Sequence, residues 1–166
     1  MNIYADRNDA AGLHDIMERY QYELFTEKGD AYTRGDWPLI YRLHVALGMT
    51  YAHLGVWDNT STPYQNAAFQ LEAAQRAADE LNRRSQSRKF ALPPPAAKKL
   101  SDYYKTTDQA NRATKVLVNA AEALQDQGRT KESADMLRLI DRKTIPSADE
   151  ETKAEYERLQ RIVPSN

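Results

Sequence analysis

The chain has 166 residues, 41% of them hydrophobic and 28% charged, which is enough for one globular domain with its own core. Its formal net charge of −1 excludes the strongly basic footprint that nucleic-acid and anionic-membrane binders normally carry, so a nucleic-acid partner is not expected. Because the chain has no cysteine, disulfides, thiolate metal sites and thiol chemistry are excluded as well.

Apolar residues at helical spacing predict two helices in the first part of the chain. The first covers about residues 9–33, with Gly29 and Gly35 marking its end. Its inward stripe consists of Leu13, Ile16, Met17, Tyr20 and Leu24. Asp36 as a cap and Pro38 in the first turn predict the start of the second helix. The second stripe consists of Ile40, Leu43, Leu47, Tyr51 and Leu54.

A third helix is predicted after a polar turn at residues 58–62, with Thr62 as its cap and Pro63 at its first position. Its alanine-rich stripe consists of Tyr64, Ala67, Leu71, Ala74, Ala78 and Leu81. The helical pattern then fails, because arginines crowd among serines and a run of prolines follows. We therefore predict a basic, proline-rich loop at residues 83–95.

The next apolar stripe covers residues 96–127 and ends at Gly128, and it fits either one helix or two. Thr106 and Gln109 fit a capping box, which favours a new helix at that point. The unbroken spacing of the stripe favours continuity. We favour the break.

Two shorter helices are predicted in the last part of the chain. The first covers about Thr130–Arg142 with Leu137 and Ile140 inward, and Pro146 prevents its continuation. Ser147 and Glu150 fit another capping box, which opens a final helix that ends at Pro164. The inward stripe of that helix consists of Tyr156, Leu159 and Val163.

No segment alternates between apolar and polar residues with the period of a strand, so the sequence predicts an all-α fold. We expect one domain over residues 1–166, with an N-terminal arm at 1–8 and about six to seven helices. No apolar stretch reaches the roughly 18 residues of a membrane span, and the first residues lack a signal peptide. We favour the cytoplasm, with the periplasm as the alternative if a signal was removed; no oligomeric state follows from the sequence.

Two segments carry a further pattern. The segment Leu47-Gly48-Met49-Thr50-Tyr51-Ala52-His53-Leu54-Gly55-Val56-Trp57 resembles the core of the tetratricopeptide repeat, a helix hairpin of roughly 34 residues. The small–bulky–small signature of that family's second helix fits Ala67, Leu71 and Ala74, about seven residues later than the consensus. A second segment at residues 114–146 keeps nearly the family's spacing. Its matching positions are Leu117, Ala120, Ala121, Leu124, Gly128, Ser133, Leu137, Ile140 and Pro146.

The resemblance implies antiparallel helix hairpins stacked as a short α-solenoid. It also implies that Gly48 lets the partner helix cross closely and that Tyr51 fills the space beside it. A peptide or helix of a partner protein would then bind the concave face, which is lined by the first helix of each repeat. In the first repeat these positions are Arg42, Val45, Met49, Ala52 and His53. In the second they are Lys115, Val118, Glu122, Gln125 and Asp126. The alternative interpretation of both sets is a solvated helix face.

The basic segment at residues 83–105 is the best local case for an anionic partner, since arginine contacts phosphates and aromatic rings stack on bases. Its cations are Arg83, Arg84, Arg88, Lys89, Lys98 and Lys99, interleaved with Phe90, Tyr103 and Tyr104. The simpler interpretation, which we favour, is a charged loop that keeps an exposed connection solvated.

Nothing in the sequence predicts a catalytic, metal or cofactor site. His14, His44 and His53 form no ligand motif, and the many carboxylates on helix faces are interpreted as solvated. Our leading hypothesis is a non-catalytic protein-interaction module, a scaffold, an adaptor or a subunit of a larger assembly. The alternatives are a binder of nucleic acid or anionic surfaces through residues 83–105, and an all-α enzyme with a site in a groove between helices.

Overall fold

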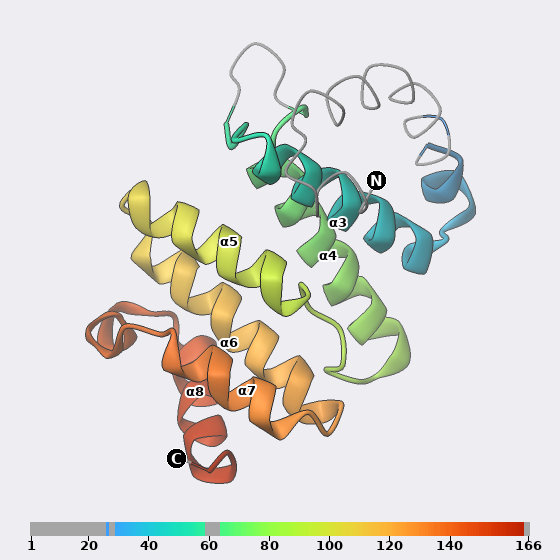
Figure 1. Ribbon diagram of the computed structural model, residues 1–166. Coiled ribbons are helices and arrows are strands. Elements are labelled where there is room, and N and C mark those ends of the chain that lie inside the picture. Colours follow the sequence, from blue (N-terminus) through green and yellow to red (C-terminus); the bar gives the residue numbers. More distant parts are fainter. Residues whose placement is uncertain (1–25, 27–28, 59–63, 165–166) are drawn as a thin grey trace. The chain divides into compact units, whose positions relative to one another are not determined.

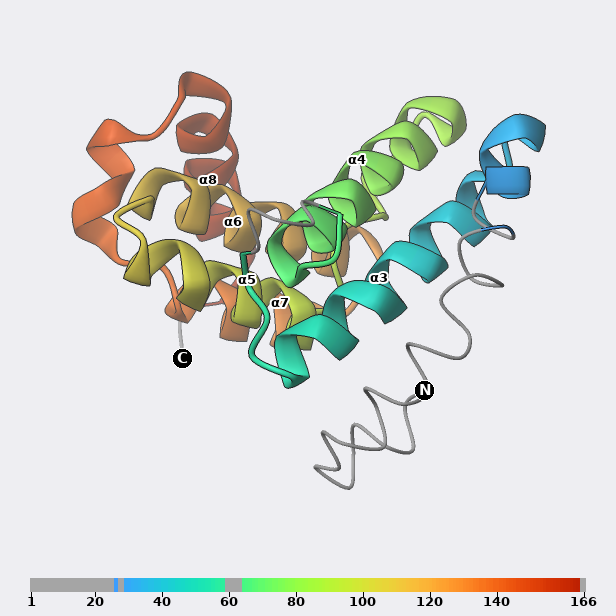
Figure 2. The same ribbon diagram turned by 90° about the horizontal axis from the view of Figure 1, so that it is seen from above.

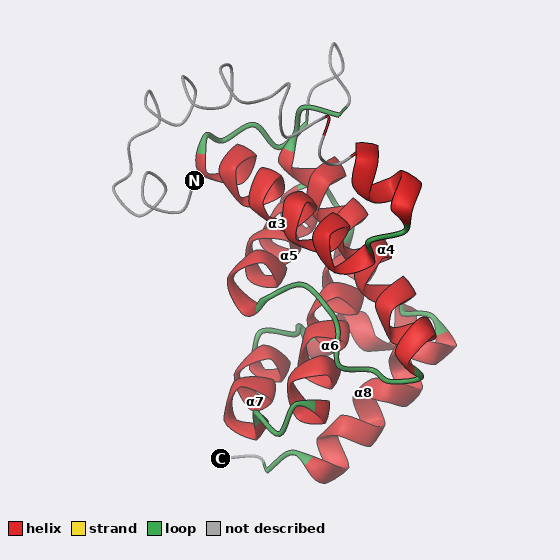
Figure 3. Cartoon of the chain, turned by 90° about the vertical axis from the view of Figure 1, so that its right-hand side faces the viewer, coloured by secondary structure: helices red, strands yellow, loops and turns green. Residues whose placement is uncertain are grey.

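The computed structural model describes residues 26, 29–58 and 64–164 (Figure 1). Every regular element in these residues is helical and none is a strand, which confirms the all-α prediction (Figure 3). No helix in the described ranges combines the length and the apolar character that a membrane span requires. The chain divides into two compact units, Met1–Leu81 and Asn82–Asn166, where the sequence suggested a single domain.

The first predicted helix lies mostly outside the described residues, as does the predicted arm, but residues 29–34 are helical. This helix ends at Gly35, which has a φ of 67°. Two hydrogen bonds close the turn, from Gly35 N to Tyr32 O at 3.1 Å and from Asp36 N to Ala31 O at 2.9 Å. Gly29 therefore lies inside a helix and does not mark its end.

Helix α3 spans Trp37–His53, as predicted for the second helix. The side chain of Asp36 caps it by accepting a hydrogen bond from Leu39 N at 3.2 Å, and Pro38 occupies its first turn. The predicted inward stripe faces the core of the first unit, where four of its members are buried: Ile40, Leu43, Leu47 and Tyr51.

Helix α4 spans Ala67–Ser85 and begins four positions after the predicted start at Pro63. The residue that caps it is Asn66, whose Oδ1 accepts a hydrogen bond from Phe69 N at 2.8 Å. The predicted cap, Thr62, lies outside the described residues, but Tyr64 and Gln65 are not helical, so the prediction of this start was wrong. The asparagine satisfies the free amide of the first turn, which is the role we assigned to the threonine.

Helices α3 and α4 approach closely at Gly48. A β-carbon built on this glycine would lie 2.6 Å from Leu71 Cδ2, so the prediction of a close crossing there is confirmed. Alanines of α4 pack against α3, since Ala67 clusters with Tyr51 and Ala52, and Ala77 clusters with Ile40. Small residues on both helices allow the two backbones to come together.

The first complete helices of the second unit are α5, Pro94–Thr106, and α6, Ala110–Asp126, so residues 96–127 form two helices, as we favoured (Figure 2). The reason for the break differs from the predicted capping box. Gln109 precedes α6 without a side-chain cap, and its amide Nε2 donates to Thr107 Oγ1 at 2.7 Å. Asp108 instead turns the chain in the left-handed conformation, with a φ of 58°.

Helix α7 spans Thr130–Arg138, a 3₁₀ turn η1 spans Arg142–Ser147, and α8 spans Glu150–Ile162. The predicted end of α7 at Arg142 was too late, and Pro146 lies inside the 3₁₀ turn. The predicted capping box at Ser147 was also wrong. Asp149 caps α8, since its Oδ1 accepts a hydrogen bond from Thr152 N at 2.8 Å.

Helix α6 lies at the centre of the second unit, where it contacts α5, α7 and α8 (Figure 1). Its inner residues Leu117, Val118 and Ala121 are at most 1% exposed. Helices α6 and α7 meet at Ser133, which is 0% exposed and donates a hydrogen bond from Oγ to Ala121 O at 2.7 Å. A buried hydroxyl is satisfied here without a bulky side chain, so the two helices can pack closely.

The loop between α4 and α5 covers residues 86–93, fewer than predicted, because α4 continues to Ser85 and α5 starts at Pro94. Two hydrogen bonds join Asn82 to Phe90: Asn82 Nδ2 donates to Phe90 O at 2.8 Å, and Phe90 N donates to Asn82 Oδ1 at 2.9 Å. Gln127 Nε2 donates to the carbonyl oxygen of Lys89 at 2.6 Å. The middle of the loop is thus fixed to α4 through Asn82 and to Gln127, which follows α6.

Candidate functional site

The α3 positions predicted to bind a partner form a partly exposed stripe in the first unit. Arg42 is exposed, whereas Val45, Met49 and His53 are half-buried. Their spacing of three, four and four residues places them along one face of α3. Ala52, which we had included, is only 9% exposed and belongs to a core cluster, so it cannot line a binding surface. We call the remaining four residues the α3 stripe.

The corresponding positions on α6 are not open in the same way, because α8 packs against this helix. Val118 is 1% exposed, which contradicts its predicted role in lining a surface. Lys115 pairs with Asp149 at 3.5 Å. Glu122 forms ion pairs within the unit, whereas Asp126 is exposed. Gln125 is half-buried, and its Oε1 has no hydrogen-bond partner among the described residues.

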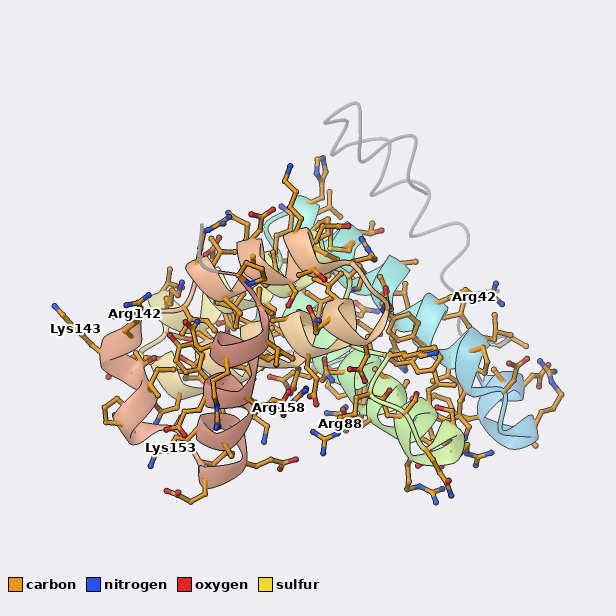
Figure 4. The ribbon with its side chains drawn as sticks, turned by 90° about the horizontal axis from the view of Figure 1, so that it is seen from below. Arg42, Arg88, Arg142, Lys143, Lys153 and Arg158 are labelled. Carbon is orange, nitrogen blue, oxygen red and sulfur yellow. The ribbon has the colours of Figure 1, made fainter. Side chains whose placement is uncertain are left out.

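Glu122 belongs to a cluster of four charged residues, which we call the ionic cluster: Arg88, Glu122, Glu155 and Arg158. Arg88 Nη1 lies 2.6 Å from Glu122 Oε1 and 3.5 Å from Glu155 Oε2. Arg158 Nη2 lies 2.5 Å from Glu155 Oε1 and 3.8 Å from Glu122 Oε1. Figure 4 shows the two arginines close together on one side of the second unit. The cluster therefore joins the 86–93 loop, α6 and α8.

The two carboxylates of the ionic cluster are much less exposed than the arginines. The side chains of Glu122 and Glu155 are 12% and 11% exposed, against 59% for Arg88. Burial raises the pKa of Glu122 above its ordinary value, and the neighbouring Glu155 raises it further, while Arg88 opposes both. Two acids and two bases balance in charge, so the arrangement is typical of a structural clamp. The ionic cluster forms only when segments distant in the sequence meet, so no local sequence pattern predicts it.

The predicted anionic-partner patch does not form a continuous basic surface. Arg88 is held by the ionic cluster, and Lys98 pairs with Asp102 at 3.3 Å. Tyr104 is 3% exposed and cannot stack on a base. The remaining cations of the patch are exposed: Arg83, Arg84, Lys89 and Lys99. Arg83 and Arg84 lie in the last turn of α4, where they complement the helix dipole.

A series of buried hydrogen bonds in the first unit was not predicted from the sequence. His44 is 2% exposed, and its Nδ1 lies 2.6 Å from Gln70 Oε1. Gln70 Nε2 donates to Tyr64 O at 2.6 Å, which orients the amide so that His44 Nδ1 is the donor. His44 Nε2 lies 2.7 Å from the hydroxyl of Tyr32. These hydrogen bonds hold the His44 ring in one orientation. The partners are separated by 12 and 26 positions, so sequence spacing could not indicate them.

A pocket of about 210 Å³ lies in the second unit, between α7 and the end of α8. Its lining consists of Ala134, Leu137, Arg138, Ile140, Arg142, Gln160, Val163 and Pro164. The titratable groups in this lining are two arginines, so it offers no carboxylate or histidine for acid–base chemistry. No group of three or more potential metal ligands occurs in the described part of the chain. His53 and His44 lie on different faces of α3, and His14 lies outside the described residues.

Comparison with known proteins adds no family to this arrangement. No protein-family model, no curated protein and no solved structure matches the chain.

Proposed function

We propose that this chain is a non-catalytic protein-interaction module: a scaffold or adaptor of tetratricopeptide-like helix pairs, or a subunit of a larger assembly, that holds a peptide or helix of a partner protein. The observation that carries the proposal is the close approach of Gly48 to Leu71. The resemblance implies that a glycine at this position lets the partner helix cross closely. Helix pairs of this kind act by presenting a surface rather than by chemistry.

The packing of the second unit supports the same interpretation. Helix α6 contacts α5, which precedes it, and α7 and α8, which follow it. Neighbour-by-neighbour packing is typical of helical repeats. Ala121 and Ser133 meet where the repeat pattern requires two small residues. These features favour a solenoid-like arrangement within this unit.

The proposed partner site is the α3 stripe. Arg42 offers an exposed cation, and Val45 and Met49 offer half-buried apolar surface, a mixture that suits a binding surface. The α6 positions contribute less, since Lys115 and Glu122 are engaged within the unit. The anionic-surface alternative is disfavoured because Arg88, at the centre of the basic segment, is neutralised by two carboxylates. The enzyme alternative has no supporting feature in the pocket lining.

Site-specific photo-crosslinking tests this proposal. Benzoylphenylalanine is placed at Arg42 in one variant and at Asp102, an exposed residue of α5, in a matched control variant. We expect one partner protein to be cross-linked in extracts of the source cells at position 42 and not at position 102. The purified partner should then bind Arg42→Glu about ten-fold more weakly than the wild type, and Asp102→Lys equally well. Equal cross-linking at both positions, or recovery of nucleic acid alone, contradicts the proposal.

A further inference from the structure

The first unit carries a second surface that combines exposed aromatic rings with an arginine. Tyr64 is 57% exposed and Tyr32 46%, which are high values for tyrosine. Phe69 is half-buried and Arg76 is exposed. Exposed tyrosine and arginine side chains are the residue types that most often contribute binding energy at protein interfaces. We call these four residues, Tyr32, Tyr64, Phe69 and Arg76, the aromatic–arginine surface.

Ring contacts connect Tyr64, Phe69 and Arg76, and Tyr32 is linked to them through the charge of Arg76. The rings of Tyr64 and Phe69 pack edge to face with centroids 5.0 Å apart. Arg76 lies over the Phe69 ring, with Cζ 5.9 Å from its centroid. The pKa of Tyr32 is raised by burial, and the charge of Arg76 partly opposes this effect, so the guanidinium lies within electrostatic range of the phenol.

A buried hydrogen-bonded chain holds the surface in place from beneath. Tyr32 is fixed by its bond to His44, and the backbone of Tyr64 is fixed by Gln70, which itself accepts from His44. Both exposed tyrosines are thus hydrogen-bonded to the buried pair formed by His44 and Gln70. A rigid aromatic surface loses little conformational entropy when it binds a partner.

Arg76 has no ion pair among the described residues, and its guanidinium contacts the Phe69 ring. A guanidinium that stacks on a ring keeps the N–H groups at its edge free for a carboxylate, which it binds in a two-pronged geometry. Other carboxylates of α4 lie within a turn of it, at Glu72, Asp79 and Glu80. A helix stretch with three acidic residues around one arginine is not the continuous basic surface that nucleic acid or an anionic membrane requires, whereas a single carboxylate can pair with one arginine.

We infer that the aromatic–arginine surface binds a short segment of a partner protein in which an acidic residue stands next to an aromatic or aliphatic one. The carboxylate pairs with Arg76, and the apolar side chain packs on Tyr64 and Phe69. This surface is separate from the α3 stripe, because Arg42 and His44 are two positions apart and point to nearly opposite sides of α3. The inference goes beyond the proposed function by assigning a second surface and the chemistry of its ligand.

The second unit offers a matched control for Arg76. Arg112 also lies over an aromatic ring, with Cζ 5.0 Å from the centroid of Tyr104. That ring is buried, and Arg112 Nη1 donates to Gln109 Oε1 at 2.9 Å. Arg112→Gln therefore removes the same kind of cation–π contact from a place without exposed aromatic neighbours.

The experiment uses a displayed library of random twelve-residue peptides, selected on the full chain and counter-selected on an unrelated helical protein. Enriched peptides should carry aspartate or glutamate beside an aromatic or aliphatic residue. Their Kd should rise about ten-fold or more in Arg76→Gln and Tyr64→Ala, and change less than about two-fold in Arg112→Gln. Arg76→Lys should restore only part of the affinity, because lysine keeps the charge without the planar fork.

Three results would overturn the inference. The first is a selection that enriches no peptide, and the second is enriched peptides that bind Arg76→Gln as well as they bind the wild type. The third is Arg76-dependent binding of single-stranded RNA or of phosphatidylserine vesicles with no peptide binding. Circular dichroism establishes that each variant is folded. Arg42→Glu separates this inference from the proposed function, since it should leave peptide binding here unchanged.

Discussion

Gly48 and Leu71 pack so closely that a β-carbon on the glycine would lie 2.6 Å from Leu71 Cδ2, 2.7 Å from Cγ and 3.1 Å from the backbone nitrogen. The leucine side chain is 0% exposed, so it has little room to move away. The backbone nitrogen belongs to α4 and can yield only if the whole helix shifts. The separation of α3 and α4 is therefore set by the absence of a side chain at position 48.

Gly48→Ala should lower the free energy of unfolding by about 1–2 kcal/mol, because overpacking costs more than the roughly 1 kcal/mol that alanine gains in helix propensity. Gly29→Ala is the matched control, since position 29 is also helical and has nothing within 4 Å of a β-carbon. That substitution should be neutral or stabilising. Urea denaturation followed by circular dichroism measures both changes. Equal effects of the two substitutions would contradict the steric account.

Gln86 ends α4 in the left-handed conformation, with a φ of 50°, and Ser87 N bonds to Asn82 O at 3.0 Å. A residue with a β-carbon is strained there, so Gln86→Gly should stabilise the chain by about 0.5–1 kcal/mol. Gly128 ends α6 in the same conformation, with a φ of 77°. Gly128→Ala should destabilise by about 1 kcal/mol. The two shifts in the thermal midpoint should have opposite signs; shifts of the same sign would rule out backbone strain as the cause.

The raised pKa of Glu122 gives a defined pH dependence. The folded state holds this proton more tightly than the unfolded state, whose pKa lies near the ordinary value of 4.5. The resulting stabilisation is complete below that value and is lost as the pH rises through the folded pKa. Glu122→Gln should therefore become more stable relative to the wild type as the pH rises above 4.5 and through the folded pKa.

Glu132→Gln serves as the control for that measurement. Its hydrogen bond with Arg129 lowers the pKa of Glu132, so the sign is reversed and this variant should lose stability relative to the wild type as the pH rises. Urea midpoints at a series of pH values compare the two variants. Parallel curves for both variants would show that the ionic cluster does not control the titration of Glu122.

Asp149 caps α8, and Asp149→Ala should cost about 1 kcal/mol of stability at neutral pH. The backbone and side-chain hydrogen bonds from Thr152, together with Lys115, hold the pKa of Asp149 below its ordinary value. Its contribution is therefore present above that value and is lost as the pH falls through the folded pKa. Ser147→Ala, at the position that the sequence suggested as the cap, should change stability by less than about 0.5 kcal/mol. A larger loss at Ser147 than at Asp149 would reverse the assignment of the cap.

The sequence predicted the features of the fold that depend on neighbours along the chain. The limits of α3 follow from Asp36, Pro38 and an uninterrupted apolar stripe, and each acts within one or two turns. The start of α4 was wrong because two capping residues compete, and proline at 63 was given more weight than Asn66. The helix break after α5 was predicted for the wrong reason, since Asp108 turns the backbone while Thr106 donates to Tyr103 O.

The sequence could not predict features that depend on tertiary contacts. Arg88 and Glu122 are 34 positions apart, and their pairing requires the 86–93 loop, α6 and α8 to be assembled. His44 and Gln70 meet only because Gly48 brings α3 and α4 together. The α6 positions were predicted as a surface because a helix stripe does not reveal which neighbour will cover it. Here α8 covers part of it.

The paired hydrogen bonds between Asn82 and Phe90 affect how the protein can be dissected. The asparagine lies in the last turns of α4, while the loop it ties belongs to the second unit. A fragment that begins after Ser85 would lack Asn82 and therefore both of its hydrogen bonds to Phe90. An expression boundary for the second unit must therefore fall inside a helix, upstream of Asn82, and not in the loop where a cut would ordinarily be made.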